Sequence, residues 1–307
     1  MPDDASQRLR QLRPVLELRS RAFSALRSFF LERGYVEVET PIRVPVPCME
    51  QHIDVMPADG HWLRTSPELH MKRMVCAGYE RIFQVGSCFR QGETGQRHNP
   101  EYTMLEWYRT GVTYTELIDE ARELVLAIAG EICRSPRIQW NGRTVDLDGL
   151  WDVKTLRDLF WLHAGWDPTD DFDGDRFDID LVDKVEPVLE DADVPVVVID
   201  YPREQAALAR LSEDNPDVAE RWELYIAGME VANAYSELTD PVEQRQRFEH
   251  WATYRRSRGL PVYPLDEDFL SAMRDGMPAC AGMALGVDRL LMLLTGRSDI
   301  ADVRAFV

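Results

Sequence analysis

The sequence is poor in cysteine and has no long apolar run. Its 307 residues include five widely spaced cysteines with no C-x-x-C pair: Cys48, Cys76, Cys88, Cys133 and Cys280. This pattern indicates neither a disulfide framework nor a zinc site. No segment reaches the roughly 18 consecutive apolar residues of a membrane span, and residues 1–4 are polar, unlike a signal peptide. We therefore expect a cytoplasmic protein with no membrane attachment.

Positive charge is also scarce. The chain has 35 lysines and arginines against 54 aspartates and glutamates, a formal net charge of -19. Extended binding along a nucleic-acid backbone is disfavoured, because such binding depends on neutralising phosphates. A small cationic substrate or a basic protein partner fits this charge, although an acidic surface that only keeps the protein soluble fits it equally well.

The common nucleotide-binding and hydrolase motifs are missing. The chain contains no G-x-x-x-x-G-K-[ST], no G-x-G-x-x-G, no H-E-x-x-H and no G-x-S-x-G. Three other segments, 89–101, 228–237 and 282–289, together carry arginines suited to a triphosphate and carboxylates suited to a divalent metal and an amine. No one of these segments is convincing alone.

The apolar pattern predicts a single domain. Residues 1–13 are expected to be a short arm or a helix start, and the spacing from Pro14 predicts a helix that stops near Gly34. Alternation over 35–39 predicts a strand that ends at Pro41. We also expect helices at 114–133 and 151–166, an acidic surface insertion at 167–180 and a buried strand at 194–201. No linker divides residues 14–307.

The first of the three segments is a predicted hairpin with strands at 85–90 and 102–108. If the second strand is regular, its even-numbered residues share one face: Tyr102, Met104, Glu106 and Tyr108. Arg90, at the end of the first strand, has a guanidinium group suited to phosphate, and Arg97 and His98 in the loop add donors. The alternative is a surface loop with ordinary charges.

The second segment is a predicted hairpin that carries two carboxylates. A turn at Ala227-Gly228 pairs Tyr225 with Glu230 and places Glu223 on the same face as Glu230, where both can share Mg²⁺. Strict alternation would put Asn233 and Glu237 on the opposite face, so a common site requires a bulge or bend near Ala234. The alternative is a solvated acidic hairpin.

Glycines and a helix start mark two further stretches. Gly282 and Gly286 allow a nucleotide to approach a strand closely, and Arg289 follows at a helix N-terminus, which favours phosphate. A packed core strand and helix is the alternative. In Thr65-Ser66-Pro67-Glu68, Ser66 suits a helix cap, whereas Glu68 either favours the helix dipole or binds a substrate ammonium.

Taken in order, these segments resemble the class II aminoacyl-tRNA synthetase core. The first helix, strand and Pro41 are similar to its dimer-forming motif 1, the Arg90 hairpin to motif 2, and 282–289 to motif 3. Residues 65–68, 97–104 and 233–238 resemble lysyl-tRNA synthetases in particular. The resemblance implies an α+β fold, with an antiparallel sheet flanked by helices, and a homodimer.

Within that class, the resemblance favours the elongation factor P-(R)-β-lysine ligase group. Only residues 1–13 precede motif 1, so we expect no anticodon-binding domain and no contact with a tRNA anticodon. Ala284, where the synthetases carry a glycine, agrees and is expected to reshape the amino-acid pocket. The implied reaction uses ATP and Mg²⁺, and it joins (R)-β-lysine or lysine to a lysine ε-amine of elongation factor P.

The resemblance also implies roles for individual residues. Arg90, Glu230 and Arg289 would be catalytic. The nucleotide site would add Gly92, Glu93, His98, Asn99, Val231 and Gly286, with Glu93 in place of the usual adenine-contacting glutamate. Glu223 and Glu230 would hold the metal. The amino acid would contact Ser66, Pro67 and Glu68 at its backbone-like end, and Glu106, Tyr108, Asn233, Glu237 and Ala284 further in.

Two other functions stay open at this point. One is a shortened synthetase paralogue that acylates a different acceptor. The other is a non-catalytic binding subunit that retains the fold, because a fold alone does not fix a function. Retention of Arg90, Glu230 and Arg289 argues against the second.

Overall fold

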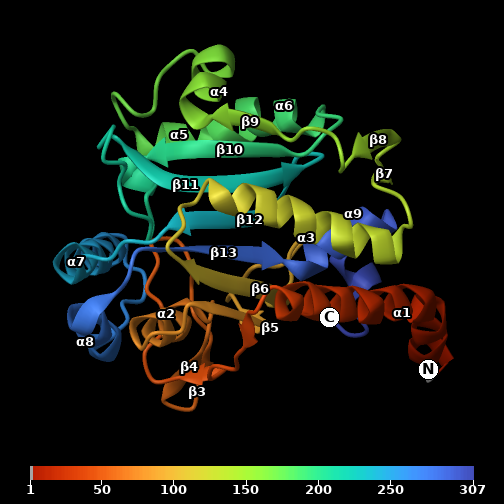
Figure 1. The fold of residues 1–307 in the computed structure, drawn as a ribbon, viewed down its shortest axis with the longest axis horizontal. Coiled ribbons are helices and arrows are strands. Elements are labelled where there is room, and N and C mark those ends of the chain that lie inside the picture. The colour runs from red at the N-terminus through yellow and green to blue at the C-terminus, as the bar shows by residue number, and fades with distance from the viewer. Residues whose placement is uncertain (1–2) are drawn as a thin grey trace.

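A computed structural model describes residues 3–307, which form one mixed sheet with helices packed on it (Figure 1). The chain opens with the 30-residue helix α1, Asp3–Glu32. Residues 3–13 are the first part of this helix, and residues 1 and 2 lie outside the described residues. Pro14 lies inside α1, where it removes one helical hydrogen bond, and Figure 1 shows α1 bending near its start. The helix stops where predicted, before Gly34 at φ +76°.

The main sheet has eight strands in the order β1-β5-β6-β13-β12-β11-β10-β9. Its first half comprises β1 Val36–Glu37, β5 Arg81–Phe89, β6 Glu101–Thr110 and β13 Cys280–Gly286. The second half comprises β12 Met229–Ser236, β11 Val218–Ile226, β10 Val196–Pro202 and β9 Asp152–Thr155. All neighbours are antiparallel except the edge pairs β1/β5 and β10/β9. The predicted α+β class, with an antiparallel sheet flanked by helices, is confirmed.

Helices cover the sheet in separate groups. In Figure 1, α1, α3 (Glu116–Ile132) and α9 (Val287–Thr295) lie along one side, and they bury the largest apolar cluster against the sheet. A second cluster packs α2 (Glu68–Cys76) against α7 (Pro241–Ser257) and α8 (Glu267–Gly276). The short helices α4 (Leu156–His163), α5 (Gly174–Asp180) and α6 (Glu186–Glu190) close a third cluster over β10.

Smaller elements complete the fold. A three-stranded sheet joins β2 Arg43–Val44, β4 His61–Leu63 and β3 Pro57–Ala58, and a hairpin pairs β7 Arg137–Trp140 with β8 Arg143–Asp146. Three further turns of helix are η1 Leu181–Val185, η2 Arg203–Gln205 and η3 Ile300–Val303. None of the helices within residues 3–307 combines the length and the apolar character needed to cross a membrane.

One predicted element was wrong in part. The expected helix at 151–166 is instead strand β9 followed by the short helix α4. Residues 152–155 pair in parallel with 196–199, and the Thr155 side chain then caps α4 by accepting from the Asp158 backbone N–H. Pairing with β10 at the sheet edge therefore makes residues 152–155 a strand, although their own apolar pattern fits a strand or a helix. The predicted helix at 114–133 and strand at 194–201 are confirmed as α3 and β10.

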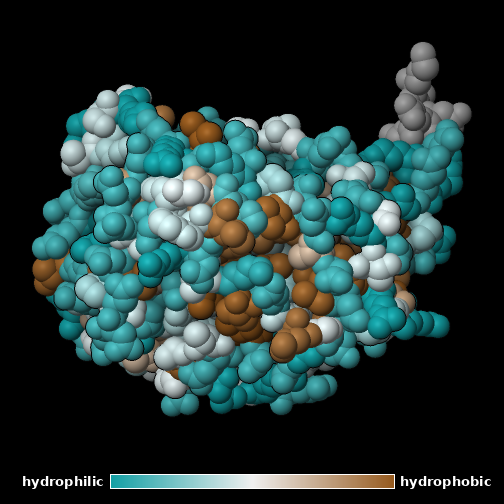
Figure 2. Space-filling model, turned by 90° about the horizontal axis from the view of Figure 1, so that it is seen from above, coloured by the Kyte–Doolittle hydropathy of each residue, from teal (hydrophilic) through white to brown (hydrophobic). Residues whose placement is uncertain are grey.

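Exposed apolar side chains gather over α4, η1 and their neighbours, on the face that Figure 2 shows. Leu162 on α4 is 75% exposed and Ile179 on α5 is 60% exposed. The acidic stretch 167–180 adjoins this face and ends in α5, whose start is capped by Asp173.

Candidate active site

The hairpin formed by β5 and β6 builds one wall of the main pocket. The two strands pair antiparallel from Arg81↔Arg109 to Phe89↔Glu101, and Arg90 follows directly after β5. The predicted alternation over 102–108 is confirmed, because its four even-numbered residues line the pocket: Tyr102, Met104, Glu106 and Tyr108. One regular strand therefore delivers an acid and a phenol side by side.

The central strand β13 forms the pocket floor because its residues there are small. Gly282, Ala284 and Gly286 pair with Tyr108, Glu106 and Met104 of β6. On the other side of β13, Gly282 and Ala284 pair with Tyr235 and Asn233 of β12. A methyl group at Gly282 would lie 2.4 Å from Glu237 Oε1 and 2.4 Å from Tyr108 Cε1. Glycine at this position therefore leaves the space in which these two side chains meet.

The hairpin of β11 and β12 forms the opposite wall. The predicted turn is confirmed, with Tyr225 paired to Glu230 and both Ala227 and Gly228 at positive φ. The register shifts by one residue between Tyr225↔Glu230 and Leu224↔Ala232, so a bulge lies at 231. The bulge lies earlier than the position near Ala234 that alternation suggested. It brings Asn233, Tyr235 and Glu237 into the same pocket as Glu230.

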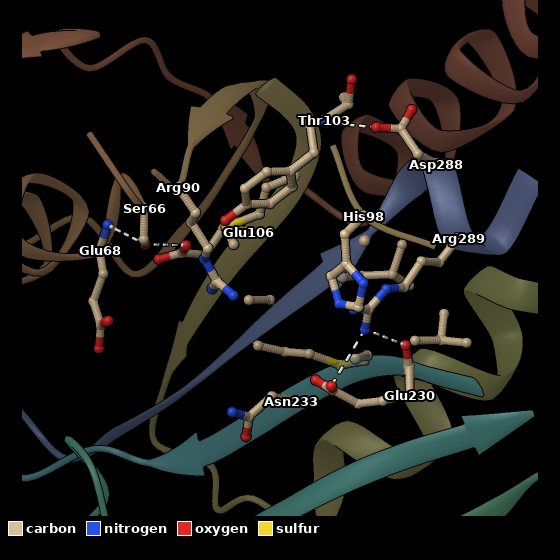
Figure 3. Close-up of a pocket in the computed structure, with 18 of the residues that line it drawn as sticks. Ser66, Glu68, Arg90, His98, Thr103, Glu106, Glu230, Asn233, Asp288 and Arg289 are labelled. Atoms are coloured by element: carbon tan, nitrogen blue, oxygen red, sulfur yellow. Dashed lines mark hydrogen bonds and ion pairs between the residues drawn. The ribbon is translucent and has the colours of Figure 1, made fainter. Parts of the chain in front are cut away.

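Arg289 and His98 lie together on one side of the pocket, close to Glu230 (Figure 3). Arg289, in the first turn of α9, donates from Nη1 to the Glu230 carbonyl at 2.8 Å and to its Oε2 at 3.2 Å. Its Nη2 lies 2.6 Å from His98 Nε2. Burial and the Arg289 charge lower the pKa of His98, which favours the neutral imidazole.

Arg90 lines the same pocket from the wall that β5 and β6 build. Its guanidinium lies 5.3 Å from the centre of the Tyr102 ring and 3.7 Å from Glu93 Oε1. The buried Arg90 Nε has no hydrogen-bond partner within residues 3–307. Two guanidinium groups that face one cavity, one with an unmet donor, are suited to a polyphosphate.

Glu106, Ser66 and Glu68 lie together on the other side of the pocket (Figure 3), which Glu237 also lines. Glu106 accepts from Tyr108 Oη and from Ser66 Oγ, each at 2.7 Å. Ser66 Oγ also accepts from the Glu68 backbone N–H at 2.9 Å, although the N-cap position of α2 is held by Pro67 rather than by Ser66 as predicted. Burial, with help from Glu68, raises the pKa of Glu106 to about 7. Burial likewise raises the pKa of Glu237 to about 8, although Lys72 opposes this shift. Such a cluster favours a cationic ligand, which would stabilise its ionised form.

Most of the predicted site residues meet in this one pocket. Pocket-lining residues among them are Ser66, Glu68, Arg90, Glu93, His98, Asn99, Glu106, Tyr108, Glu230, Val231, Asn233, Glu237, Ala284, Gly286 and Arg289. Three do not line it. Gly92 is exposed in the loop after Arg90, Pro67 is buried at the start of α2, and Glu223 lies behind Glu230 on β11.

The two predicted metal ligands, Glu230 and Glu223, differ in exposure and in how many hydrogen bonds their carboxylates already accept. Glu230 has a side chain that is 43% exposed. Glu223 is 10% exposed and accepts from three donors: Tyr201, Tyr225 and Arg221. Within residues 3–307, no three or more His, Cys, Asp or Glu side chains are arranged so that they could hold a metal ion together. Mg²⁺ commonly takes one or two carboxylates together with substrate phosphates, so Glu230 fits an ion that arrives with a nucleotide. Glu223 could become a second ligand of this ion only if its carboxylate oxygen Oε1 lost the contact with Arg221.

Sequence reasoning missed Glu50 and Lys72. Glu50 lines the pocket from a loop between β2 and β3, where no periodic pattern marks it. Burial raises its pKa to about 7, while Arg90 opposes the shift. Lys72 stands four residues after Glu68, a helical spacing that brings two side chains together and that could have revealed the contact.

Comparison with known proteins agrees with this geometry. Residues 5–307 match the family model of class II tRNA synthetases (D, K and N). The chain therefore belongs to the class II tRNA synthetase family.

Within the family, two relatives match along nearly their whole length. The elongation factor P-(R)-β-lysine ligase of Photorhabdus laumondii is 40% identical, over 94% of this chain and 93% of that protein. The ligase of the same name from Yersinia enterocolitica is 39% identical, over 95% of both chains. The lysine-tRNA ligase of Prochlorococcus marinus is 35% identical over 96% of this chain, which spans 64% of that relative. The predicted similarity to the short lysyl-tRNA synthetase paralogues is confirmed.

Proposed function

We propose that this protein is an ATP-dependent ligase that activates (R)-β-lysine or lysine and transfers it to a lysine ε-amine of elongation factor P. The observation that carries the proposal is a single pocket lined both by Arg90 and Arg289 and by the carboxylates Glu68, Glu106 and Glu237. A triphosphate needs the arginines, and an amino acid with two amines needs the carboxylates. Full-length similarity to the elongation factor P ligases supports the choice of acceptor.

In the first step, the amino-acid carboxylate attacks the α-phosphorus of ATP. The bond from this phosphorus to the bridging oxygen of pyrophosphate breaks, which gives an aminoacyl-adenylate and pyrophosphate. Arg90 and Arg289 would stabilise the negative charge on the phosphates, and Glu230 would hold Arg289 through the observed contact. Bound Mg²⁺ would supply further neutralisation of phosphate charge, with Glu230 as the carboxylate available to it.

In the second step, the neutral ε-amine of the acceptor lysine attacks the mixed anhydride. An amide forms, AMP leaves, and the amine loses a proton to solvent or to the departing phosphate. No covalent bond to the enzyme forms in either step. The contribution of this chain is to position the reactants and match their charge. A homodimer and a cytoplasmic location are further parts of the proposal.

Pyrophosphate exchange tests the activation step. Wild-type protein should exchange labelled pyrophosphate into ATP only when (R)-β-lysine or lysine is present. Arg289→Ala should lower kcat/KM for this exchange at least about tenfold, because it removes a charged contact to phosphate. Arg297→Ala, at an exposed site just beyond the same helix, is the matched control and should leave the rate unchanged. Absence of exchange with either amino acid in folded wild-type protein would contradict the proposal.

A further inference from the structure

Lys72 is an ammonium group that the protein itself places among the pocket carboxylates. The residue is on α2, one helical turn after Glu68, and its side chain is 1% exposed. Its Nζ donates to Glu68 Oε1 at 2.5 Å and lies 2.5 Å from Glu237 Oε2. Both acceptors line the pocket, whereas Lys72 stands behind them. A cation of the protein thus joins two groups that the proposed substrate would also contact.

The charge of Lys72 is secure despite its burial. Burial alone opposes the charged form, but Glu237 and Glu68 together raise the pKa of Lys72 above its ordinary value. Other titratable groups that feel this charge are Glu106 and the thiols of Cys48, Cys76 and Cys280. At neutral pH the cluster therefore contains a permanent ammonium.

The pairing leaves Glu237 able to take a further donor. Lys72 Nζ lies 2.5 Å from the buried Oε2 of Glu237 and occupies that oxygen. The other oxygen, Glu237 Oε1, lies beside Gly282, where the edge of the Tyr108 ring also lies. Glu68 likewise has a second oxygen beyond the one that Lys72 occupies. Lys72 thus orients the two carboxylates without using all their acceptor sites.

We propose that Lys72 is a specificity-determining positioning residue, which neutralises one of three carboxylates so that the pocket accepts a substrate with two ammonium groups. Glu50, the further carboxyl near Glu68, is offset by Arg90. When Glu68, Glu106 and Glu237 are ionised, the Lys72 ammonium offsets one of their three charges, and the two ammonium groups of lysine or β-lysine can match the other two. Lys72 also holds Glu68 and Glu237 on either side of itself, which keeps their free oxygens apart. This role rests on the proposed function, because it concerns the same substrate.

The first test is independent of any substrate and compares urea unfolding of three proteins at pH 7.5. Lys72→Met should lower the midpoint strongly, because it leaves several buried carboxylates without a cation. Adding Glu237→Gln to this variant removes one carboxylate together with the ammonium and should restore a large part of the loss. Lys154→Met, at a lysine on β9 whose side chain is 42% exposed, should leave the midpoint unchanged. A double variant no more stable than Lys72→Met would overturn the proposal.

The second test concerns the substrate and uses pyrophosphate exchange. Lys72→Ala should raise KM for the diamine acid at least about tenfold while KM for ATP stays within about twofold. Propylammonium in the assay should partly restore the lower KM, whereas propanol, which has the same shape but no charge, should not. Equal effects of the two additives, or an unchanged KM for the amino acid, would contradict the role of Lys72. Failure of the wild-type protein to exchange would instead count against the proposed function.

Discussion

At the scale of single residues, the pocket depends on carboxyls whose ionisation falls near neutral pH. Glu106 is 2% exposed, and both its oxygens accept hydrogen bonds from neighbouring hydroxyls. Burial raises its pKa to about 7, above that of a glutamate in an unfolded chain. Because the folded pKa is the higher one, the stability from this group is present at low pH. It is lost as the pH rises through about 7. The acid thus destabilises the empty protein in the pH range where it would bind an amine.

This gives a prediction for the pH dependence of substrate binding. KM for the amino acid should fall about tenfold between pH 6 and pH 8, as Glu106 and then Glu237 ionise. Glu106→Gln should raise KM at pH 8 and flatten the part of the profile near pH 7. The measurement is KM by pyrophosphate exchange across this range. A KM in wild-type protein that does not change with pH would refute the assigned role of these carboxyls.

Gly282 gives a steric prediction. Gly282→Ala places a methyl group 2.4 Å from both Glu237 Oε1 and the Tyr108 ring, so one of these must move. We expect a loss of amino-acid binding by about 1–3 kcal/mol, the usual effect of overpacking, with little change in KM for ATP. Gly130→Ala in helix α3 is the control, because nothing lies within 4 Å of its added methyl group. Calorimetric titration with lysine measures the affinity of each variant. Equal affinities of the two variants would show that the space beside Gly282 does not matter for amino-acid binding.

Residue patterns predicted the pocket only where they were regular. The alternation over 102–108 placed Glu106 and Tyr108 on one face, and the strand confirms it. Glu50 could not be predicted, because an irregular loop brings it to the pocket. The contact of Lys72 with Glu237 joins a helix to the end of a strand 165 residues later, which local spacing cannot reveal.

At the scale of elements, α7 holds the pocket loop that carries Glu50. Arg255 on α7 is fully buried and donates to the backbone carbonyls of Glu50, Gln51 and Ile53 at 3.0–3.1 Å. It also pairs with the Asp54 carboxylate. The Asp54 carbonyl in turn accepts from the Gln91 N–H at 2.9 Å, next to Arg90. One guanidinium therefore links a distant helix to the loop of Glu50 and, through Asp54, to the segment next to Arg90.

Removing this guanidinium should destabilise the protein. Arg255→Met leaves several buried carbonyls without a donor, and loss of one partner in a buried ionic network commonly costs about 3–5 kcal/mol. Arg256→Met, the adjacent exposed residue on the same helix, should change stability by less than about 0.5 kcal/mol. Chemical unfolding of the two variants gives the comparison. A similar loss in both would mean that Arg255 is not the group that secures the loop.

Elements were predictable in proportion to their length and regularity. The turn at 227–228 followed from its sequence, but the bulge at 231 did not, because it depends on pairing with β11. Strand β9 was taken for helix because the helical pattern of α4 follows it directly. Whether the four residues of β9 form a strand depends on their pairing with the neighbouring strand β10.

At the scale of the molecule, the sheet order brings distant segments to one place. Strands β6 and β13 are neighbours, although about 170 residues separate them, and β12 lies on the other side of β13. The sequence indicated which segments carry the chemistry, and the resemblance to a family indicated that they meet. Apolar periodicity alone could not have ordered eight strands.

The exposed surface gives a prediction of assembly. Leu31, Val36 and Ile42, near the end of α1 and along β1 and its exit, are 55%, 50% and 44% exposed. In the predicted homodimer this region would be buried. Light scattering should give about twice the chain mass of 35.4 kDa. Leu31→Glu with Val36→Glu should shift the protein toward monomer, and Val242→Glu on α7, at a site 63% exposed, should not. A wild-type monomer at micromolar concentration would contradict the prediction.

The central claim is that this pocket activates a diamine acid for transfer to a protein. Its most direct test is the intact mass of elongation factor P after incubation with this protein, ATP, Mg²⁺ and either (R)-β-lysine or lysine. We predict the addition of one lysyl or β-lysyl group to a single lysine, with no change when ATP is left out. An unmodified factor alongside active pyrophosphate exchange, or acylation of tRNA in its place, would contradict the assignment of the acceptor.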